Sequence, residues 1–509
     1  MQNLMSMATK KAPRIGLVEL PLLKLIDPEG KNWNPSGKKI VLSSKQILLA
    51  NLRAGGFDAQ LVDLRADDYE EEFGEVTWRG IHLSKRYSGT RISSLDPESF
   101  DAWGVTNNFT LNRTIALMVI RHLASGTKPV VVGGSDAIAE PHLYLQAGAA
   151  AVVTDKSGAA NWPIFDYLLK RPMRESLSGA ILADGTKYPL SLHPMTPEEW
   201  PLPSLDIVKQ CFGYRNPNIF DPRMNPIGSV IPDMGCDRKC DFCQTPTYGT
   251  GYKRMSPQRA LEWYALQKEA GASLVSSLSD QFLGRVLFKG GKQEILDIMK
   301  GIRDLGLAIS WLNGLELRKA TKGRGYDRNS DDLTPDLELV EAVWGWDGKV
   351  GTYEVYIPAE RPVFGRESYA KLLPWKQHRE MVRAIVLSGV PRILYGVIVG
   401  LPDDNHESML RLEEALSEIY QEVKTINPSV SFDIDIYAIS PLPGTPQGCS
   451  IGQSGLLRFE DPEIRGGFMT ACADTHHMSY EEVSDWQFRL ESIGNWEITQ
   501  PFVNVKSTK

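Results

Sequence analysis

The sequence predicts an α/β protein with an N-terminal Rossmann-like domain, a partial TIM barrel and a small, mostly helical C-terminal region. Strand-like apolar runs alternate with helical stretches from Arg14 to about Leu169, and the alternation resumes after Gly228. A proline-rich segment with little periodicity lies between the two. A chain of 509 residues is also too long for one core. The expected units are a Rossmann-like domain at 1–169, a linker at 170–227, a (β/α)6 partial barrel at 228–450 and a helical region at 451–509.

The first unit contains five candidate strands separated by helical spacing. The strands are expected at 15–20, 59–64, 102–106, 129–134 and 150–155. Residues 43–54 and 111–124 have helical spacing, and 137–147 resembles a short helix interrupted by Pro141. Within the linker, the segment DGTKYPLSL is typical of a small hairpin.

The second unit repeats the alternation about six times, which suits a partial TIM barrel with its chemistry at the carboxyl ends of the strands. Strands are expected near 228–232, 273–278, 307–312, 352–357, 393–399 and 432–438, and helices at 256–270, 291–305, 376–389 and 406–423. The polar insertion 321–335 is expected to be a surface loop. Of two helical stretches in the last 60 residues, 479–493 is the clearer, and the sequence indicates no function for this region.

The composition narrows the class of protein and its partners. Hydrophobic residues make up 42% and charged residues 23%, and no run of 18 apolar residues is present, so we expect no integral membrane protein. The polar N-terminus, which lacks a small-residue cleavage site, predicts a cytoplasmic location. With 56 basic and 63 acidic residues, the net charge of −7 gives no general attraction to nucleic acid or to anionic lipid. A small-molecule or peptide substrate is therefore expected.

Three of the six cysteines fall within eight positions, which indicates a cofactor site rather than a disulfide framework. The segment GCDRKCDFCQTP places Cys236, Cys240 and Cys243 in a C-x3-C-x2-C array directly after a strand. Three thiolates on one loop suit three corners of an iron–sulfur cubane and leave the fourth iron open to another ligand. A structural zinc site is the main alternative, but such sites usually have four ligands with paired C-x2-C spacing.

This array, with the aromatic Phe242 before its last cysteine, resembles the radical S-adenosylmethionine (SAM) superfamily over roughly 228–450. Further matching segments follow at successive strands, namely SLSDQFLGR, NGLELRK, YEVYIPAE, YGVIVGLP and DIYAISPLPGTP. The resemblance implies a [4Fe-4S] cluster on the three cysteines and SAM along the strand ends. It further implies SAM contacts at positions that match the family's motifs: Phe242, Asp280, Gln281, Asn313, Val397, Ile398 and Gly400. Asp280 and Gln281 stand where the family usually has a GGE motif that contacts the methionine amino group, but GGE itself is absent here. The segment GVIVG, taken alone, is equally well explained as a buried parallel strand with no role in binding.

In the first unit, VVVGGSDAIAEPHLYLQAGAAAVVTD has a strand, a Gly-Gly-Ser turn and a helix, so that backbone N–H groups can lie close to a ligand. Dinucleotide binding is poorly supported because no G-x-G-x-x-G opens the first βα turn. The segment resembles the cobalamin-binding domain of the B12-dependent branch of the superfamily, as does WGVTNNFTLNRT upstream. The resemblance implies cobalamin contacts at Thr106, Asn108, Gly133, Gly134 and Ser135. A degenerate Rossmann fold that binds no corrin is the alternative.

One departure concerns the lower face of cobalt. Cobalamin domains of this kind generally carry D-x-H-x-x-G, whose histidine binds cobalt from below, whereas the matching strand here ends DLRADDY. Cobalt would then have no histidine ligand from this motif, and a nearby cation such as Arg65 would favour transfer of its methyl group as a cation. A solvated surface arginine is the alternative.

Cobalamin with a radical SAM barrel implies an enzyme, a methyltransferase that moves a methyl group from SAM via methylcobalamin to a carbon of a small molecule. The segments CDFCQTP, SDQFLGR and WLNGLELRKAT are most similar to the tryptophan 2-C-methyltransferases of thiopeptide antibiotic biosynthesis, which makes C2 of tryptophan the expected acceptor. An electron donor for the cluster or for cobalamin is the expected partner. A base or acceptor must hold the indole N–H, and among candidates on strands three and four we favour Tyr356 or Glu354 over Glu316 and Glu360.

Three alternatives stay open. One is a cobalamin-dependent radical methylase of an sp3 carbon in another natural product, which would produce 5′-deoxyadenosine. Another is a radical SAM enzyme that rearranges or oxidises its substrate and yields no methylated product. The third is a non-catalytic iron–sulfur carrier, against which the strand-two to strand-six segments argue because a carrier needs no SAM cleft.

Overall fold

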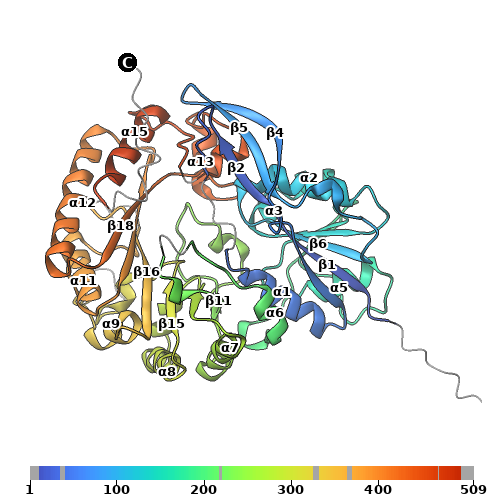
Figure 1. Ribbon diagram of the computed structural model, residues 1–509, viewed down its shortest axis with the longest axis horizontal. Helices are drawn as coiled ribbons and strands as arrows, with labels where there is room; N and C mark the ends of the chain where they lie inside the picture. The colour runs from blue at the N-terminus through green and yellow to red at the C-terminus, as the bar shows by residue number, and fades with distance from the viewer. Residues whose placement is uncertain are drawn as a thin grey trace, which may run out of the picture.

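The computed structural model describes residues 11–34, 40–216, 220–324, 332–363, 369–467 and 469–494. A mostly parallel sheet and a wholly parallel sheet form two lobes, the first beginning in blue and the second running from green at β11 and α7 to red (Figure 1). The predicted α/β fold class is therefore confirmed. In the part of the chain that is described, no helix is long and apolar enough to cross a membrane.

The N-terminal lobe is built on a seven-stranded sheet of order β10-β9-β8-β7-β6-β1-β3. Its five parallel strands coincide with the five predicted runs and are β1 (Arg14–Glu19), β3 (Asp58–Asp63), β6 (Ala102–Thr106), β7 (Val130–Gly133) and β8 (Ala151–Val153). The predicted hairpin forms from β9 (Ala180–Leu182) and β10 (Lys187–Tyr188) and pairs antiparallel with β8. Part of the expected linker thus extends this sheet.

Helices cover both faces of the sheet. Their apolar sides form two cores, and the helices are α1 (Ser43–Ala54), α2 (Arg113–Leu123), α3 (Ser135–Ala139), α4 (Pro141–Gln146), α5 (Asn161–Leu168) and α6 (Leu205–Gln210). The break between α3 and α4 falls at Pro141, as predicted, because proline lacks the N–H that would continue α3 and is tolerated at the first position of α4.

A three-stranded antiparallel sheet, β2-β5-β4, was not predicted. It consists of β2 (Leu22–Ile26), β4 (Tyr69–Trp78) and β5 (Ile81–Gly89). The alternation is weak in the sequence because β4 reads YEEEFGEVTW, with a solvated acidic face. The sheet joins the two ends of the chain, since the indole of Trp78 donates to the carbonyl of Ala471 (2.8 Å) and Lys85 pairs with Asp461 (2.7 Å).

The second lobe is a six-stranded parallel sheet of order β11-β14-β15-β16-β17-β18, and all six predicted strands are present. They are β11 (Ile227–Val230), β14 (Leu274–Ser277), β15 (Ala308–Trp311), β16 (Gly351–Glu360), β17 (Arg392–Val399) and β18 (Ser431–Ala438). Helices on the outside of the arc are α7 (Pro257–Ala270), α8 (Gly291–Asp304), α9 (Leu337–Trp344), α11 (Trp375–Leu387) and α12 (His406–Ile426) (Figure 1). The sequence missed α9, which follows the polar insertion; residues 325–331 of that insertion lie outside the described part.

The C-terminal region covers the open edge of this partial barrel. Its helices are α13 (Pro446–Gln453), α14 (Pro462–Arg465) and α15 (Tyr480–Glu491), the last begun by a capping box between Ser479 and Glu482. The amide of Gln487 on α15 donates to the carbonyl of Ile436 on β18 (2.6 Å). An edge strand exposes backbone groups that need partners, and α15 supplies a partner for one of them while covering this edge.

The two lobes also meet through α1 and the barrel. The side-chain amide nitrogen of Gln46 donates to the hydroxyl of Ser229 (3.1 Å). The side-chain nitrogen of Gln267 in turn donates to the side-chain oxygen of Gln46 (3.0 Å). All three side chains are buried, which makes this a satisfied polar contact between the lobes. Together with the sheet β2-β5-β4, it fixes the N-terminal lobe to the barrel at two separate places.

Candidate active site

The three cysteines of the array lie on one loop, between the short strands β12 (Asp233–Met234) and β13 (Lys253–Arg254). All three are partly exposed. The loop turns tightly, because the Cys243 N–H donates to the Cys240 carbonyl (3.2 Å) and Gly235 adopts a φ of +75°. A Cβ at Gly235 would lie 1.9 Å from the carbonyl oxygen of Gly251, so only glycine fits where the two ends of the loop pass each other.

The donor set of this loop suits an iron–sulfur cluster. Burial raises the pKa of the Cys236 thiol and raises that of Cys240 to about 12, while the charges of Lys319 and Lys371 act in the opposite direction. A metal deprotonates its thiol ligands, and these two lysines would compensate the resulting negative charge. Among the described residues, no three cysteine, histidine, aspartate or glutamate side chains already form a metal-binding group.

A buried network of charges ties the cysteine loop to the loop after β15. The Glu316 carboxylate accepts from the Arg238 guanidinium (2.5 and 3.1 Å) and from the Lys319 ammonium (2.6 Å), and Lys319 also pairs with Asp237 (2.6 Å). Gln281 donates to the same carboxylate (3.2 Å). Asp237 and Arg238 lie between the first two cysteines, so this network positions the cysteine loop against the barrel.

Replacing Glu316 with alanine is expected to destabilise the protein by about 3 kcal/mol, the low end for breaking a buried ion pair, because the buried Lys319 ammonium keeps Asp237 as its partner while Arg238 loses its main one. Thermal unfolding followed by circular dichroism measures the effect. Glu262→Ala on the exposed face of α7, whose carboxylate pairs with Arg259, is the matched control and is expected to change stability by less than about 1 kcal/mol. Equal melting temperatures for Glu316→Ala and the control would contradict the positioning role.

A second ion pair lies near Cys240. Burial alone would lower the pKa of Lys371, but the charges of Glu360 and Cys240 outweigh it and raise that pKa, so the ammonium stays charged. Lys371 pairs with Glu360 and lies 5.6 Å from the centre of the Phe242 ring. Phe242 also meets Tyr369 edge to face (5.1 Å). Phe242 therefore packs behind the cysteine loop.

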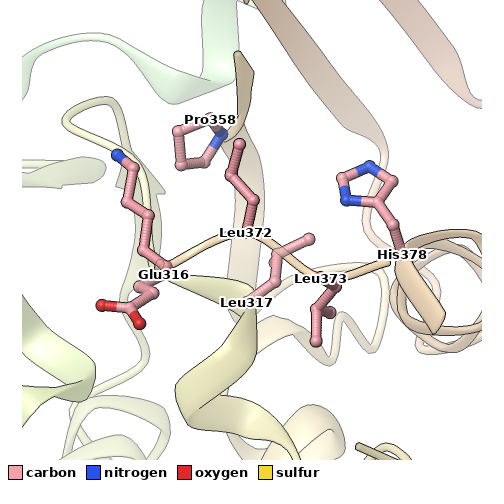
Figure 2. Close-up of a pocket in the computed structure, with 7 residues that line it drawn as sticks. Glu316, Leu317, Pro358, Leu372, Leu373 and His378 are labelled. Carbon is pink, nitrogen blue, oxygen red and sulfur yellow. The ribbon is translucent and has the colours of Figure 1, made fainter. Parts of the chain in front are cut away.

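A small pocket adjoins this pair (Figure 2). Its lining is charged on one side and apolar on the other, and consists of Glu316, Leu317, Pro358, Lys371, Leu372, Leu373 and His378. His378 hydrogen-bonds to the hydroxyl of Tyr395 (2.8 Å), and burial lowers its pKa to about 4. It is therefore a neutral structural side chain at physiological pH rather than a proton carrier.

Two residues predicted to contact SAM lie directly beside the cysteine loop. The Asp280 carboxylate accepts the Gly235 N–H (2.7 Å), and burial raises its pKa even though part of the side chain faces solvent. Gln281 joins the Glu316 network from the same segment. Asn313 is exposed on the turn after β15. Asp280 and Gln281 are thus brought together with the cysteines.

The segment predicted to form the adenine slot divides between two sides of β17. Val397 is fully buried in the core between the sheet and its helices, so that only its backbone is available to a ligand inside the barrel. Ile398, one position later, is partly exposed, and Gly400 has a φ of +81°. Side chains alternate along a strand, which explains why neighbouring residues differ in this way.

The two candidate bases on β16 have different surroundings. The Glu354 carboxylate is fully buried and accepts from Arg215 (2.7 Å), Ser310 (2.9 Å) and Arg392 (3.4 Å), which holds its pKa below the usual value despite burial. These partners favour a structural role. Tyr356 instead faces the barrel interior and is partly exposed there. Burial raises its pKa, so the phenol stays protonated.

Sequence reasoning missed three interior residues near Tyr356. A Cβ at Gly396 would lie 1.8 Å from the Tyr356 hydroxyl oxygen, so glycine is what makes room for the phenol. Asp435 and Tyr437 on β18 also face inward, and burial, with help from the charge of Asp433, raises the pKa of Asp435 to about 7. The alternation of polar and apolar residues in DIDIY is a signal that could have identified this inward face.

In the N-terminal lobe, the residues predicted to contact cobalamin gather at the carboxyl ends of β6 and β7. The set is Thr106, Asn108, Gly133, Gly134 and Ser135, and all of them are at least partly exposed. The Ser135 N–H donates to the side-chain oxygen of Asn108 (3.2 Å), and Gly134, with a φ of +107°, packs its α-carbon against the carbonyl of Asn107. This edge offers small and polar groups to a ligand.

Arg65 lies at the carboxyl end of β3 and is not a free surface cation. Its guanidinium donates to both carboxylate oxygens of Asp63 (2.9 Å each) and to the carbonyl of Ile40 (2.9 Å). Only 8% of the residue is exposed. The solvated alternative is therefore wrong, and Asp63 neutralises much of the charge of Arg65 locally.

No protein-family model and no curated protein sequence matches this chain. Several solved structures match it. The radical SAM methyltransferase TsrM from Kitasatospora setae, with cobalamin and a [4Fe-4S] cluster bound, matches with a TM-score of 0.60 and 14% identity over 98% of this chain and 92% of TsrM. TsrM with tryptophan substrate and the SAM analogue aza-SAM matches with a TM-score of 0.55 and 14% identity, over 87% of this chain and 76% of that one.

The cobalamin-dependent SAM radical enzyme OxsB, with aqua-cobalamin and SAM bound, matches with a TM-score of 0.62 and 14% identity over 95% of this chain and 66% of OxsB. At this level of identity the likeness shows the fold, and it extends over nearly the whole chain. It confirms, for the fold, the resemblance to cobalamin-dependent radical SAM enzymes that the sequence indicates.

Proposed function

We propose that this chain is an enzyme that moves a methyl group from SAM, by way of a bound corrinoid, to a carbon of a small molecule, and that C2 of tryptophan is the acceptor. The observation that supports the proposal most is the meeting of two candidate sites. Tyr248, five residues after the last cysteine, lies with its ring 4.8 Å from the ammonium of Lys156, which in turn donates to Ser135 (2.9 Å). The cysteine loop and the edge of the N-terminal sheet thus face each other.

Cys236, Cys240 and Cys243 would hold a [4Fe-4S] cluster, the residues at the β6 and β7 ends would hold cobalamin, and the strand-two segment with Ile398 would hold SAM. When bound, these cofactors supply electron transfer and the methyl group. The chain supplies no histidine at the end of β3, and there the side chain is Arg65, paired with Asp63. We propose that a corrinoid bound here would meet the paired Arg65 and Asp63 on this segment instead of a histidine, and that it would supply a methyl group able to leave as a cation.

Inside the barrel, Tyr356 is the proposed partner of the indole N–H. Its phenol stays protonated, so its oxygen accepts a hydrogen bond from the N–H and orients C2 toward the incoming methyl group. The new bond joins the methyl carbon to C2, and the proton on C2 must then leave. Asp435, with a pKa near 7, is the proposed acceptor of that proton. SAM is converted to S-adenosylhomocysteine.

The test is anaerobic reconstitution of the full chain with iron, sulfide and hydroxocobalamin, followed by incubation with SAM, tryptophan and a low-potential reductant as electron donor. Mass spectrometry is expected to find methyltryptophan and S-adenosylhomocysteine, without 5′-deoxyadenosine. Methylation of another compound accompanied by 5′-deoxyadenosine would redirect the assignment to a radical methylase. Products without an added methyl group would indicate a rearranging or oxidising enzyme and would contradict the proposal.

A further inference from the structure

Lys156 is a cation without a counterion in a place where the proposed corrinoid would bind. It follows β8, and its ammonium donates to the Ser135 hydroxyl (2.9 Å) and to the Asn108 side-chain oxygen (3.4 Å). Among the described residues it makes no ion pair, although Asp280 lies near enough for its charge to be felt. Burial lowers the pKa of Lys156 to about 8, because a buried ammonium is disfavoured where no anion compensates its charge.

The surroundings of Lys156 are suited to a single negative charge. A hydroxyl, an amide and the face of the Tyr248 ring already surround the ammonium, so a ligand oxygen would complete its coordination. The other residues gathered at this edge, such as Thr106 and Gly133, are uncharged. An anion bound here would therefore meet Lys156 as its cationic partner.

We infer that Lys156, with Ser135 and Asn108, is an anion subsite that binds the phosphodiester of the cobalamin nucleotide tail. This inference rests on the proposed function. The phosphodiester is the one anionic group of cobalamin, because the side chains around the corrin ring are neutral amides. The same subsite explains why an ammonium is kept at a ligand-binding edge whose remaining side chains are neutral.

The experiment measures binding of hydroxocobalamin and of aquocobinamide, which lacks the phosphodiester and the nucleotide, to the full-length protein by absorbance titration. Lys156→Met is expected to weaken hydroxocobalamin binding about 10- to 100-fold and to leave cobinamide binding unchanged. Lys156→Arg, which keeps the charge, is expected to retain most of the affinity. Lys187→Met, on the exposed strand β10 of the same sheet, is the matched control and is expected to have no effect.

Two further readouts locate the contact. The ³¹P resonance of bound cobalamin is expected to move in Lys156→Met and to stay in place in Lys187→Met. Above pH 8 the unliganded Lys156 has lost its proton and must regain it to bind an anion, so the wild-type affinity falls with rising pH. Tyr248 and Asp280 are the titratable groups that face Lys156, and burial raises the pKa of both. Lys156→Arg is expected to show no such decline.

Each remaining outcome overturns the inference. Equal hydroxocobalamin binding in the wild type and Lys156→Met, or equal weakening of both corrinoids, would exclude a contact with the phosphodiester. A loss of SAM affinity alone would assign the cation to the carboxylate of SAM instead. Failure of the wild type to bind hydroxocobalamin would overturn the proposed function together with this inference, whereas the other outcomes leave the proposed function standing.

Discussion

Replacing Cys236, Cys240 and Cys243 together with alanine is expected to abolish cluster assembly, with bound iron falling to background and the charge-transfer absorbance near 400 nm disappearing. Three thiolates are the protein ligands available on this loop, and a cubane loses its attachment without them. Because cobalamin would be held by the other lobe, hydroxocobalamin binding is expected to persist in the variant. Anaerobic reconstitution followed by iron, sulfide and cobalt determination gives all three quantities on one sample.

The control for the cysteine variant is Cys449→Ala, which removes an exposed thiol on α13 outside the loop. It is expected to assemble a normal cluster. Iron and sulfide retained by the triple variant at the level of the control would place the cluster elsewhere in the chain. One metal per chain bound without sulfide by the wild type would instead support the zinc alternative.

Tyr356→Phe is expected to lower the rate of substrate methylation by about 100-fold or more, with cluster and cobalamin content unchanged. The variant keeps the ring in the space that Gly396 leaves open and removes only the hydroxyl that would hold the indole N–H. The measurement is the initial rate of methylated product at saturating SAM. The same preparation gives the cofactor content from its absorbance.

Tyr353→Phe is the matched control, since Tyr353 lies on the same strand but packs against Phe220 and Trp346 (ring centres 5.5 and 5.6 Å). It is expected to methylate at close to the wild-type rate. Wild-type activity in Tyr356→Phe would remove Tyr356 from the reaction and leave Asp435 as the interior group to test. A loss of bound cobalamin in Tyr356→Phe would point to a role in cofactor binding instead.

Local patterns in the sequence predicted most of the fold. Every strand of the two parallel sheets that was expected is present, because apolar runs bounded by Gly, Pro and polar residues need no knowledge of distant partners. The sheet β2-β5-β4 was not predicted because β4 has an acidic face and its buried side packs against residues almost 400 positions away. The hydrogen bond from the Trp78 indole to the Ala471 carbonyl is an example. The packing of α15 against β18 was also not predicted, because the helical spacing of 479–493 does not show which strand the helix covers, and Gln487 lies 51 positions from its partner Ile436.

The candidate site was predictable where its residues are close in sequence. The cysteine spacing defines one loop, and the GG-S turn marks one sheet edge. Contacts between loops were not predictable, since the ion pair of Arg238 with Glu316 spans 78 positions and depends on how the barrel curves. The meeting of Lys156 with Tyr248 depends in addition on how the lobes dock. The sequence also did not show which side of its strand each side chain faces. Val397 was therefore expected to line the adenine slot, although its side chain packs in the core with the helices.

The measurement that tests the account most directly is the iron and cobalt content of the anaerobically reconstituted full-length protein. A chain with a cubane on the cysteine loop and a corrinoid at the facing sheet edge must hold both at once, with about four iron atoms and one cobalt atom per chain. Electron paramagnetic resonance of the cobalt(II) form is expected to be unchanged when the histidines of the protein carry ¹⁵N, because no histidine binds cobalt. Iron without cobalt, cobalt without iron, or a histidine nitrogen bound to cobalt would contradict the account.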